Sequence, residues 1–230
     1  MSFLKKNAPV IADVLAVVTA IFMAASAWLA FNYAPMETVM GWPQKIFYFH
    51  VPIAIMCYVG FLFTFIGSIG FLWTKDFMWD RVAVSGAETG IVFTTLVLAT
   101  GMFWGKPIWG AYWTWDPRLT TSLILLIIFS GYLILRSRVE DETLRAKYAA
   151  VMGIVGYADV PLVHYSVKLW SRGIHPVLEK KAGDPGMHQD MYLALEICFV
   201  TFLLLFTLVF IQRLRLETLK DDVNRLKIQR

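Results

Sequence analysis

Two histidines and a dense group of tryptophans are the residues of this 230-residue chain whose types and spacing suggest chemistry. His50 stands in the stretch Tyr-Phe-His-Val-Pro and His175 in the stretch Ser-Arg-Gly-Ile-His-Pro, and they are two of only four histidines. A neutral imidazole is a common ligand of metal ions, iron included. The pair would suit a single iron atom if the fold brought both side chains to the same end of the molecule.

The tryptophans lie between these two histidines, in the segment 104–118, where four of them occur within twelve residues. A single tryptophan most often anchors a helix end at the membrane interface, and that alternative stays open for each ring. Four indoles and a tyrosine, spaced by glycines and prolines, are more than an anchor needs. They predict a rigid aromatic platform for a wide, flat, apolar ligand. The platform residues are Trp104, Trp109, Tyr112, Trp113 and Trp115.

Histidines on separate elements beside such a platform match the requirements of heme. We predict that His50 and His175 are axial ligands of one heme iron and that the indoles cover the porphyrin face. The heme would be of the b type and held non-covalently, because the chain has no C-x-x-C-H motif for covalent attachment. Arg118, Arg172 and Lys168 would pair with its propionates, although ordinary solvated charge is an equally simple reading of each.

Other polar residues near these positions leave alternatives open. Asp116 stands before Pro117 and Arg118 and marks a turn followed by a helix start. Asp116 is included among the predicted heme contacts, and capping or pairing with Arg118 is its alternative. His164 and His188 lie on the same predicted side and are not included in the predicted site.

Four acidic residues fall within or near apolar runs, where acids often mark ion paths. Two of them, Asp159 and Glu196, could instead orient a ligand histidine. Asp13 and Glu88 lie near the ends of their runs that are predicted below to be cytoplasmic, and they could simply reach the membrane interface there.

These residues need a scaffold, and the composition predicts one made of membrane-spanning helices. The 58% of hydrophobic residues leaves too little polar surface to enclose a soluble domain of this size. The apolar residues form six runs near the 20 residues needed to cross the hydrocarbon core, and each run is continuous rather than alternating. The predicted fold is therefore an all-α polytopic bundle of six transmembrane helices with outward-facing loops. The runs are Val10 to Tyr33, Ile46 to Trp73, Val82 to Phe103, Leu119 to Leu135, Ala146 to Val167 and Met191 to Ile211.

We expect one domain, because no linker or low-complexity stretch divides the chain. Residues 1–212 form the six-span domain, with the tryptophan loop at 104–118. Residues 213–230 form an amphipathic tail, in which Leu219, Val223 and Leu226 recur at helical spacing.

The distribution of lysine and arginine predicts the orientation, since basic residues tend to stay in the cytoplasm. Fourteen of the 21 basic residues lie in the N-terminus, the even-numbered connections and the tail, against seven in the odd-numbered connections. Both termini should therefore be cytoplasmic, with the tryptophan loop and His175 on the outer face. The net charge of +4 is a topology signal and does not predict binding to nucleic acid.

From Trp104 to Arg118 the chain reads Trp-Gly-x-x-x-Trp-Gly-x-Tyr-Trp-x-Trp-Asp-x-Arg. This segment resembles the WWD signature of the heme-handling proteins of cytochrome c maturation. The length, the six apolar runs and the histidines on either side of the loop are similar to the heme exporter protein C (CcmC) family. The resemblance covers nearly the whole chain.

The resemblance implies a protein of the bacterial cytoplasmic (inner) membrane that holds heme between the WWD loop and two outward histidines, matched here by His50 and His175. It also implies delivery of that heme to the membrane-anchored chaperone CcmE. The implied partners are the ATP-hydrolysing CcmA, the membrane subunit CcmB, the small protein CcmD and membrane lipid. Such a chain holds heme b transiently, transfers it and is not itself an enzyme.

Two other functions compete with this reading. A b-type heme subunit of a quinol-linked redox enzyme would normally pair its histidines inside the membrane, whereas these histidines cluster near one surface. A solute transporter would use the intramembrane acids, but they form no relay across the helices.

Overall fold

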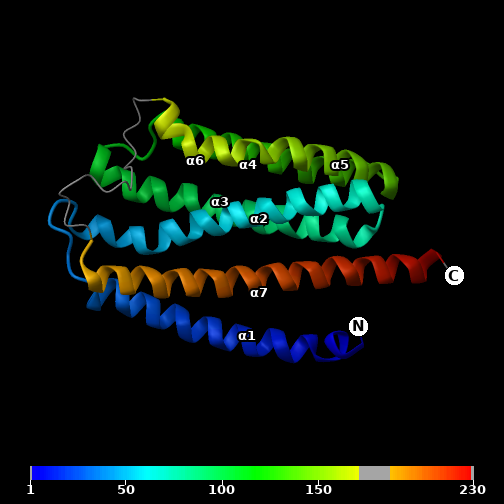
Figure 1. The fold of residues 1–230 in the computed structure, drawn as a ribbon, viewed down its shortest axis with the longest axis horizontal. Coiled ribbons are helices and arrows are strands. Elements are labelled where there is room, and N and C mark those ends of the chain that lie inside the picture. The colour runs from blue at the N-terminus through cyan, green and yellow to red at the C-terminus, as the bar shows by residue number, and fades with distance from the viewer. Residues whose placement is uncertain (1, 171–186, 229–230) are drawn as a thin grey trace.

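The computed structural model describes residues 2–170 and 187–228, and within these ranges it is a bundle of long helices without strands (Figure 1). A π-helical turn, Leu29–Tyr33, extends the first helix, and a 3-10 turn, Trp42–Ile46, precedes the second. Among the described residues, six stretches are long and apolar enough to cross a membrane, which confirms the predicted fold class. The helices are α1 (Ser2–Trp28), α2 (Phe47–Thr74), α3 (Phe77–Trp109), α4 (Pro117–Arg138), α5 (Glu142–Tyr157), α6 (Asp159–Leu169) and α7 (Gln189–Ile228).

The third span extends further than the hydropathy pattern indicated. Helix α3 continues six residues past Phe103 and ends only at Gly110, which has a positive φ of 77° and donates its amide hydrogen to the carbonyl oxygen of Lys106. A glycine in this conformation is a common helix terminator. The first part of the expected loop, with Trp104 and Trp109, is therefore helical, and the connection to α4 is short.

Two other spans also differ from simple rods. The fifth is divided into α5 and α6 at Ala158, next to Asp159. Helix α7 continues without a break past Arg213, so the last span and the described part of the tail form a single helix.

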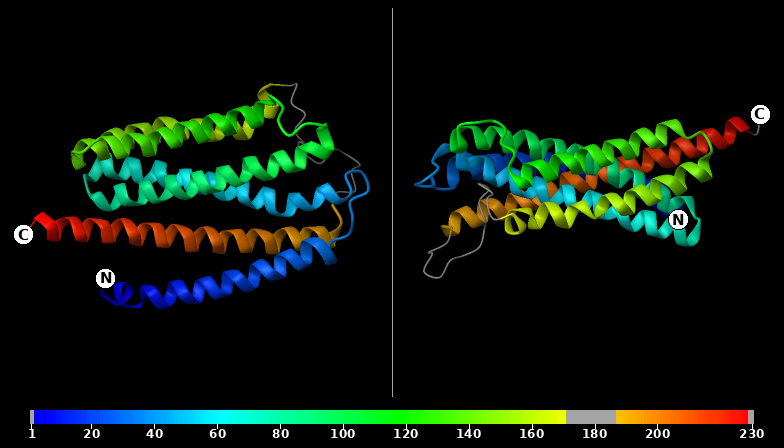
Figure 2. Two further views of the ribbon diagram at one scale, coloured as in Figure 1. Left: turned by 180° about the vertical axis from the view of Figure 1, so that it is seen from behind. Right: turned by 90° about the horizontal axis from the view of Figure 1, so that it is seen from above.

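The helices run roughly parallel to one long axis, so the bundle has two distinct ends (Figures 1 and 2). We call the end of the bundle where α1, α3 and α6 finish and where α2, α4 and α7 begin the loop end. The opposite end, which carries both chain termini, is called the terminal end. Helices α2 and α3 occupy the middle of the bundle, α4, α5 and α6 cover one side of them, and α7 covers the other. Helix α1 packs mainly on α7 at the edge.

The central pair, α2 and α3, packs closely because glycines face each other along the contact. A Cβ atom added to Gly60 would lie 2.8 Å from the Cα atom of Gly90, and one added to Gly67 would lie 2.7 Å from the backbone of Ala83. Small residues let helix backbones approach within membranes, where helix association relies on van der Waals packing. Beside this contact the rings of Phe61 and Phe129 stack with centroids 3.9 Å apart in the main apolar core.

Ion pairs join the helices toward the terminal end. The guanidinium group of Arg136 on α4 binds both carboxylate oxygens of Asp80 on α3, at 2.6 and 2.8 Å, and both side chains are largely buried. Glu88 of α3, one of the four acids in the apolar runs, pairs with Arg213 of α7. These bonds give Glu88 a structural partner and connect three helices at this end.

Candidate functional site

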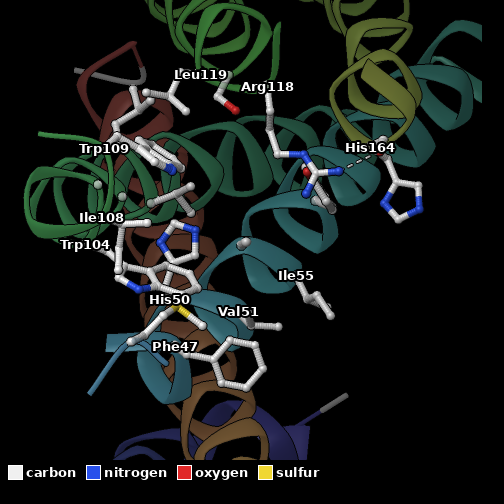
Figure 3. Close-up of a pocket in the computed structure, with 18 residues that line it drawn as sticks. Phe47, His50, Val51, Ile55, Trp104, Ile108, Trp109, Arg118, Leu119 and His164 are labelled. Atoms are coloured by element: carbon white, nitrogen blue, oxygen red, sulfur yellow. Dashed lines mark hydrogen bonds between the residues drawn. The ribbon is translucent and has the colours of Figure 1, made fainter. Parts of the chain in front are cut away.

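A cavity of about 230 Å³ lies at the loop end of the bundle, between α2, α3, α4 and α6. Its wall is mainly apolar, and the titratable or charged side chains along it include His50, Arg118 and His164. Figure 3 shows His50 beside Trp104 on one side of the cavity and Arg118 with His164 on the other. The described structure thus brings one predicted iron ligand and the first part of the tryptophan segment to one place.

His50 lies in the first turn of α2 and its side chain is wedged against α3. The residue is only 7% exposed, and its Nδ1 atom lies 2.8 Å from the hydroxyl oxygen of Thr100. Its ring meets the indole of Trp104 at a centroid distance of 5.6 Å and a steep angle. A Cβ atom added to Gly101 would lie 3.3 Å from the ring, so the glycine leaves the space that the imidazole needs.

The four tryptophans of the segment 104–118 separate into two pairs. Trp104 and Trp109, on the last two turns of α3, line the cavity. Trp113 and Trp115 lie in the connection to α4, where their rings meet edge to face at 5.7 Å, and they are not among the cavity-lining residues. Trp115 is 77% exposed. The expected single platform is thus an inner pair in the cavity wall and an outer pair beyond it.

Tyr112 belongs with the outer group. It is exposed, its ring packs edge to face on Phe103, and the ammonium group of Lys106 lies 5.2 Å from its centroid.

Asp116 and Arg118 begin α4, as the sequence indicated. The carboxylate of Asp116 accepts a hydrogen bond of 2.9 Å from the backbone amide of Arg118, so it caps the helix, and Pro117 occupies the first helical position. The guanidinium group of Arg118 is separate from this cap. It lines the cavity and donates to the carbonyl oxygen of His164 at 3.1 Å. Of the alternatives for these two residues, the structure shows helix capping by the Asp116 side chain. The Arg118 side chain takes no part in the cap and lies in the cavity wall.

His175 and Arg172 lie outside the described residues, so their predicted contacts are not part of this geometry. Lys168, on α6, is exposed. His188, at the start of α7, is exposed, lies 3.4 Å from the carboxylate of Asp190 and is not among the cavity-lining residues.

Two residues at the site, one in the cavity wall and one behind His50, were not recognised from the sequence. His164 lines the cavity although it matched no ligand position, and Thr100 contacts His50 although a threonine in an apolar helix carries no signal of its own. The one available hint was spacing, because Thr100 stands four residues before Trp104 and so lies on the same face of α3.

Two hydrogen-bond donors at the cavity wall lack acceptors within the described part of the chain. They are the indole nitrogen of Trp104 and the Nε atom of Arg118, and both are buried. Buried polar atoms nearly always have a partner, so such donors suit a ligand that carries acceptor oxygens. No group of three His, Cys, Asp or Glu side chains among the described residues could hold a metal ion. The apolar wall and these donors together suit a largely apolar ligand that carries such oxygens.

Comparison with known families gives one match over nearly the full length of the chain. Residues 2–229 match the family model described as CcmC, heme exporter protein C. The chain belongs to the heme exporter protein C family. The resemblance found in the WWD segment is thereby confirmed, and the family implies a role in heme handling for cytochrome c maturation.

Individual members of the family are similar along most of the chain. Heme exporter protein C of Bradyrhizobium diazoefficiens is 32% identical over 93% of this chain and 81% of its own length. The Haemophilus influenzae protein of the same name is 32% identical over 84% of this chain and 78% of its own length. A ccmC-like mitochondrial protein of cytochrome c biosynthesis from Arabidopsis thaliana is 34% identical, over 85% and 74% respectively.

Proposed function

We propose that this chain binds heme in the loop-end cavity and delivers it to the chaperone CcmE. The observation that carries the proposal is the meeting of a buried histidine, His50, with Trp104 and Trp109 in an apolar cavity of a heme exporter protein C family member. His50 and His175 act as the axial ligands of the heme iron in this proposal.

The remaining polar side chains have separate roles. Trp104 and Trp109 cover part of the porphyrin, and Arg118 and Arg172 bind propionate oxygens, for which an arginine can offer two parallel donors. The Nε atom of Arg118 and the indole nitrogen of Trp104 are donors available for this purpose in the described structure.

The size of the cavity fits transfer better than storage. Its volume of about 230 Å³ is below the roughly 300–1,000 Å³ of pockets that enclose drug-sized ligands. It would therefore enclose only part of a heme, and the outer pair, Trp113 and Trp115, offers further aromatic surface at the same end. A partly exposed heme b, held without a covalent bond, is accessible to an accepting chaperone.

The setting of this function is also proposed. The loop end faces the periplasm of a bacterial inner membrane, both termini are cytoplasmic, and lipid surrounds the bundle. CcmB and CcmD are membrane partners, and CcmA supplies ATP hydrolysis, so this chain itself needs no enzymatic activity.

The experiment is heme absorbance of the purified protein with His50→Ala and the matched control His188→Ala, whose imidazole is exposed and outside the cavity. His50→Ala should convert the spectrum of two strong nitrogen ligands to that of one, and added imidazole should partly restore it. His188→Ala should leave the spectrum unchanged. Delivery of heme to CcmE should fall in His50→Ala and stay unchanged in His188→Ala.

Three results would contradict the proposal in different ways. An unchanged spectrum in His50→Ala would remove the ligand assignment even if cytochrome c maturation failed. Stoichiometric heme that never exchanges would favour the b-type redox subunit. Absence of heme binding in the wild-type protein under all loading conditions would favour a transporter.

A further inference from the structure

We propose that Thr100 is a positioning residue that holds His50 in the tautomer with the proton on Nδ1, so that Nε2 is the nitrogen that coordinates iron. This proposal rests on the proposed function and deepens it at one residue. Its evidence is the hydrogen-bond geometry between α2 and α3.

The direction of the hydrogen bond between the two side chains follows from counting protons. A threonine hydroxyl has one hydrogen to donate and can accept two. The Thr100 hydroxyl lies 2.7 Å from the carbonyl oxygen of Leu96 and 3.2 Å from that of Val97, the usual acceptors for a threonine inside a helix. Its hydrogen is therefore directed to the backbone of α3. Only lone pairs remain for His50, whose Nδ1 lies 2.8 Å away, so His50 must donate.

This assignment has a chemical consequence for metal binding. In a neutral imidazole only one nitrogen carries a proton, and the hydrogen bond made by one nitrogen decides which nitrogen can bind metal. A proton held on Nδ1 by Thr100 leaves the lone pair on Nε2. The tautomer is then set before heme arrives, which avoids a proton shift during binding.

The nature of the partner matters as much as its position. Metal-bound histidines often donate to a carboxylate, which makes the imidazole a stronger ligand. The Nδ1 atom of His50 instead faces a neutral hydroxyl, which lacks the charge to strengthen the ligand in this way. A ligand of ordinary strength suits a protein that must release its heme. The acids that the sequence suggested for such a role, Asp159 and Glu196, are not the partners of this nitrogen.

The ring has little freedom to leave this arrangement. Trp104 packs against it, and the backbone of α3 lies close at Gly101, where an added Cβ atom would be 3.3 Å from the ring. Thr100 is itself fixed by its bonds to its own helix. A rigid acceptor and a confined ring together define one tautomer and one orientation.

The variants Thr100→Val and Thr100→Ser test the proposal, with Thr95→Val as the matched control. Valine keeps the shape and removes the acceptor, and serine restores it. Thr95 lies on the same helix and bonds the carbonyl oxygen of Ile91 in the same way, but it is exposed and does not contact His50. The control therefore measures the loss of a helical threonine without the loss of the contact.

The first readout is the tautomer itself, measured in the heme-free protein by nitrogen NMR of ¹⁵N-labelled histidine, with His50→Ala to assign the signals. Wild type, Thr100→Ser and Thr95→Val should show Nδ1 protonated and Nε2 unprotonated. Thr100→Val should show a mixture of both tautomers. An unchanged His50 tautomer in Thr100→Val would overturn the proposal.

The second readout is the heme complex. Thr100→Val should weaken heme binding about tenfold, the lower end of the usual effect of losing the hydrogen-bond partner of a metal ligand. It should also broaden or shift the electron paramagnetic resonance signal of the ferric heme, and Thr100→Ser should restore it. A changed tautomer with wild-type heme affinity and signal would overturn the positioning role. An unchanged heme spectrum in His50→Ala would instead overturn the proposed function. The two failures can be told apart, because the tautomer of His50 is measured in the heme-free protein.

Discussion

At the scale of single residues, the tryptophans of the segment 104–118 are not equivalent. Trp104 and Trp109 contribute to the cavity wall, and Trp104 also contacts both His50 and Phe47. Trp115 is largely exposed. Tryptophans of one short motif therefore occupy two different environments, and the motif alone does not show which tryptophan lies in which.

This division predicts unequal effects on heme retention. Trp104→Ala or Trp109→Ala should each weaken heme binding by on the order of 1 kcal/mol, about fivefold, because an indole face in the cavity wall is lost. Trp115→Ala should have a smaller effect, because that ring is outside the cavity. Equilibrium titration with heme in detergent measures the difference.

The control for these variants is Trp73→Ala, at the far end of α2, where the indole is 83% exposed. It should leave heme affinity unchanged. Equal losses in Trp104→Ala and Trp73→Ala would show that the tryptophans serve membrane anchoring rather than the cavity.

Residue types were the predictable part of the site. His50, Trp104, Trp109 and Arg118 were expected near one another, and the structure places all four around one cavity. The separation of Trp113 and Trp115 was not predictable, because it depends on α3 continuing to Gly110. Thr100 was missed because a threonine in an apolar helix usually just bonds its own backbone, which this one also does.

At the scale of the elements, the close contact between α2 and α3 positions the site. His50 belongs to α2, whereas Thr100, Gly101 and Trp104 belong to α3. The distance between the two helices therefore decides whether the hydrogen bond between His50 and Thr100 can form. The glycine contact at Gly60 and Gly90, further along the same pair, fixes that distance.

The variant Gly60→Ala should loosen this pair without touching the cavity. Its new methyl group would lie 2.8 Å from the backbone of Gly90, and neither backbone can yield without helix separation. Overpacking of this kind costs about 1–3 kcal/mol of stability. We expect a lower thermal unfolding midpoint in detergent and weaker heme binding in the same variant.

Gly131→Ala on α4 is the matched control, because its methyl group would meet only the flexible end of the Met152 side chain at 3.1 Å. Heme binding should be the same as in wild type. If Gly60→Ala also bound heme normally despite a lower midpoint, the α2 to α3 distance would not control the site.

The membrane spans were predictable from the sequence, whereas the ion pairs between them were not. Continuous apolar runs identified all six spans, because a chain in lipid must satisfy its backbone hydrogen bonds within each helix. The pairing of Glu88 with Arg213 and of Asp80 with Arg136 was not predicted. These partners are 125 and 56 residues apart, and a single sequence carries no local signal for such distant contacts.

At the scale of the whole molecule, the two ends of the bundle differ in construction. Toward the terminal end, ion pairs connect α3 to α4 and to α7, and Arg81 adds a bond of 2.7 Å to Asp221 on the tail part of α7. The loop end instead holds the cavity, with its apolar wall and exposed tryptophan. These ion pairs thus hold α3, α4 and α7 together at the end of the bundle away from the cavity.

The last prediction concerns which side of the membrane each end faces. The basic residues favour cytoplasmic termini, so a cysteine in place of Lys106 should react with a membrane-impermeant maleimide in intact cells. A cysteine in place of Lys220 should react only after permeabilisation. Lys106 lies at the loop end and Lys220 at the terminal end, and both are exposed.

The native thiols give little background in this experiment, because Cys57 and Cys198 are both buried, and a variant with both replaced by alanine serves as the baseline. The reverse labelling pattern would place the cavity in the cytoplasm and exclude delivery of heme to a chaperone on the outer face. Labelling of both positions from the same side would contradict six spans, because three spans separate Lys106 from Lys220 and an odd number of crossings places them on opposite sides of the membrane. Helices α3 and α7 accordingly run in opposite directions in Figure 1.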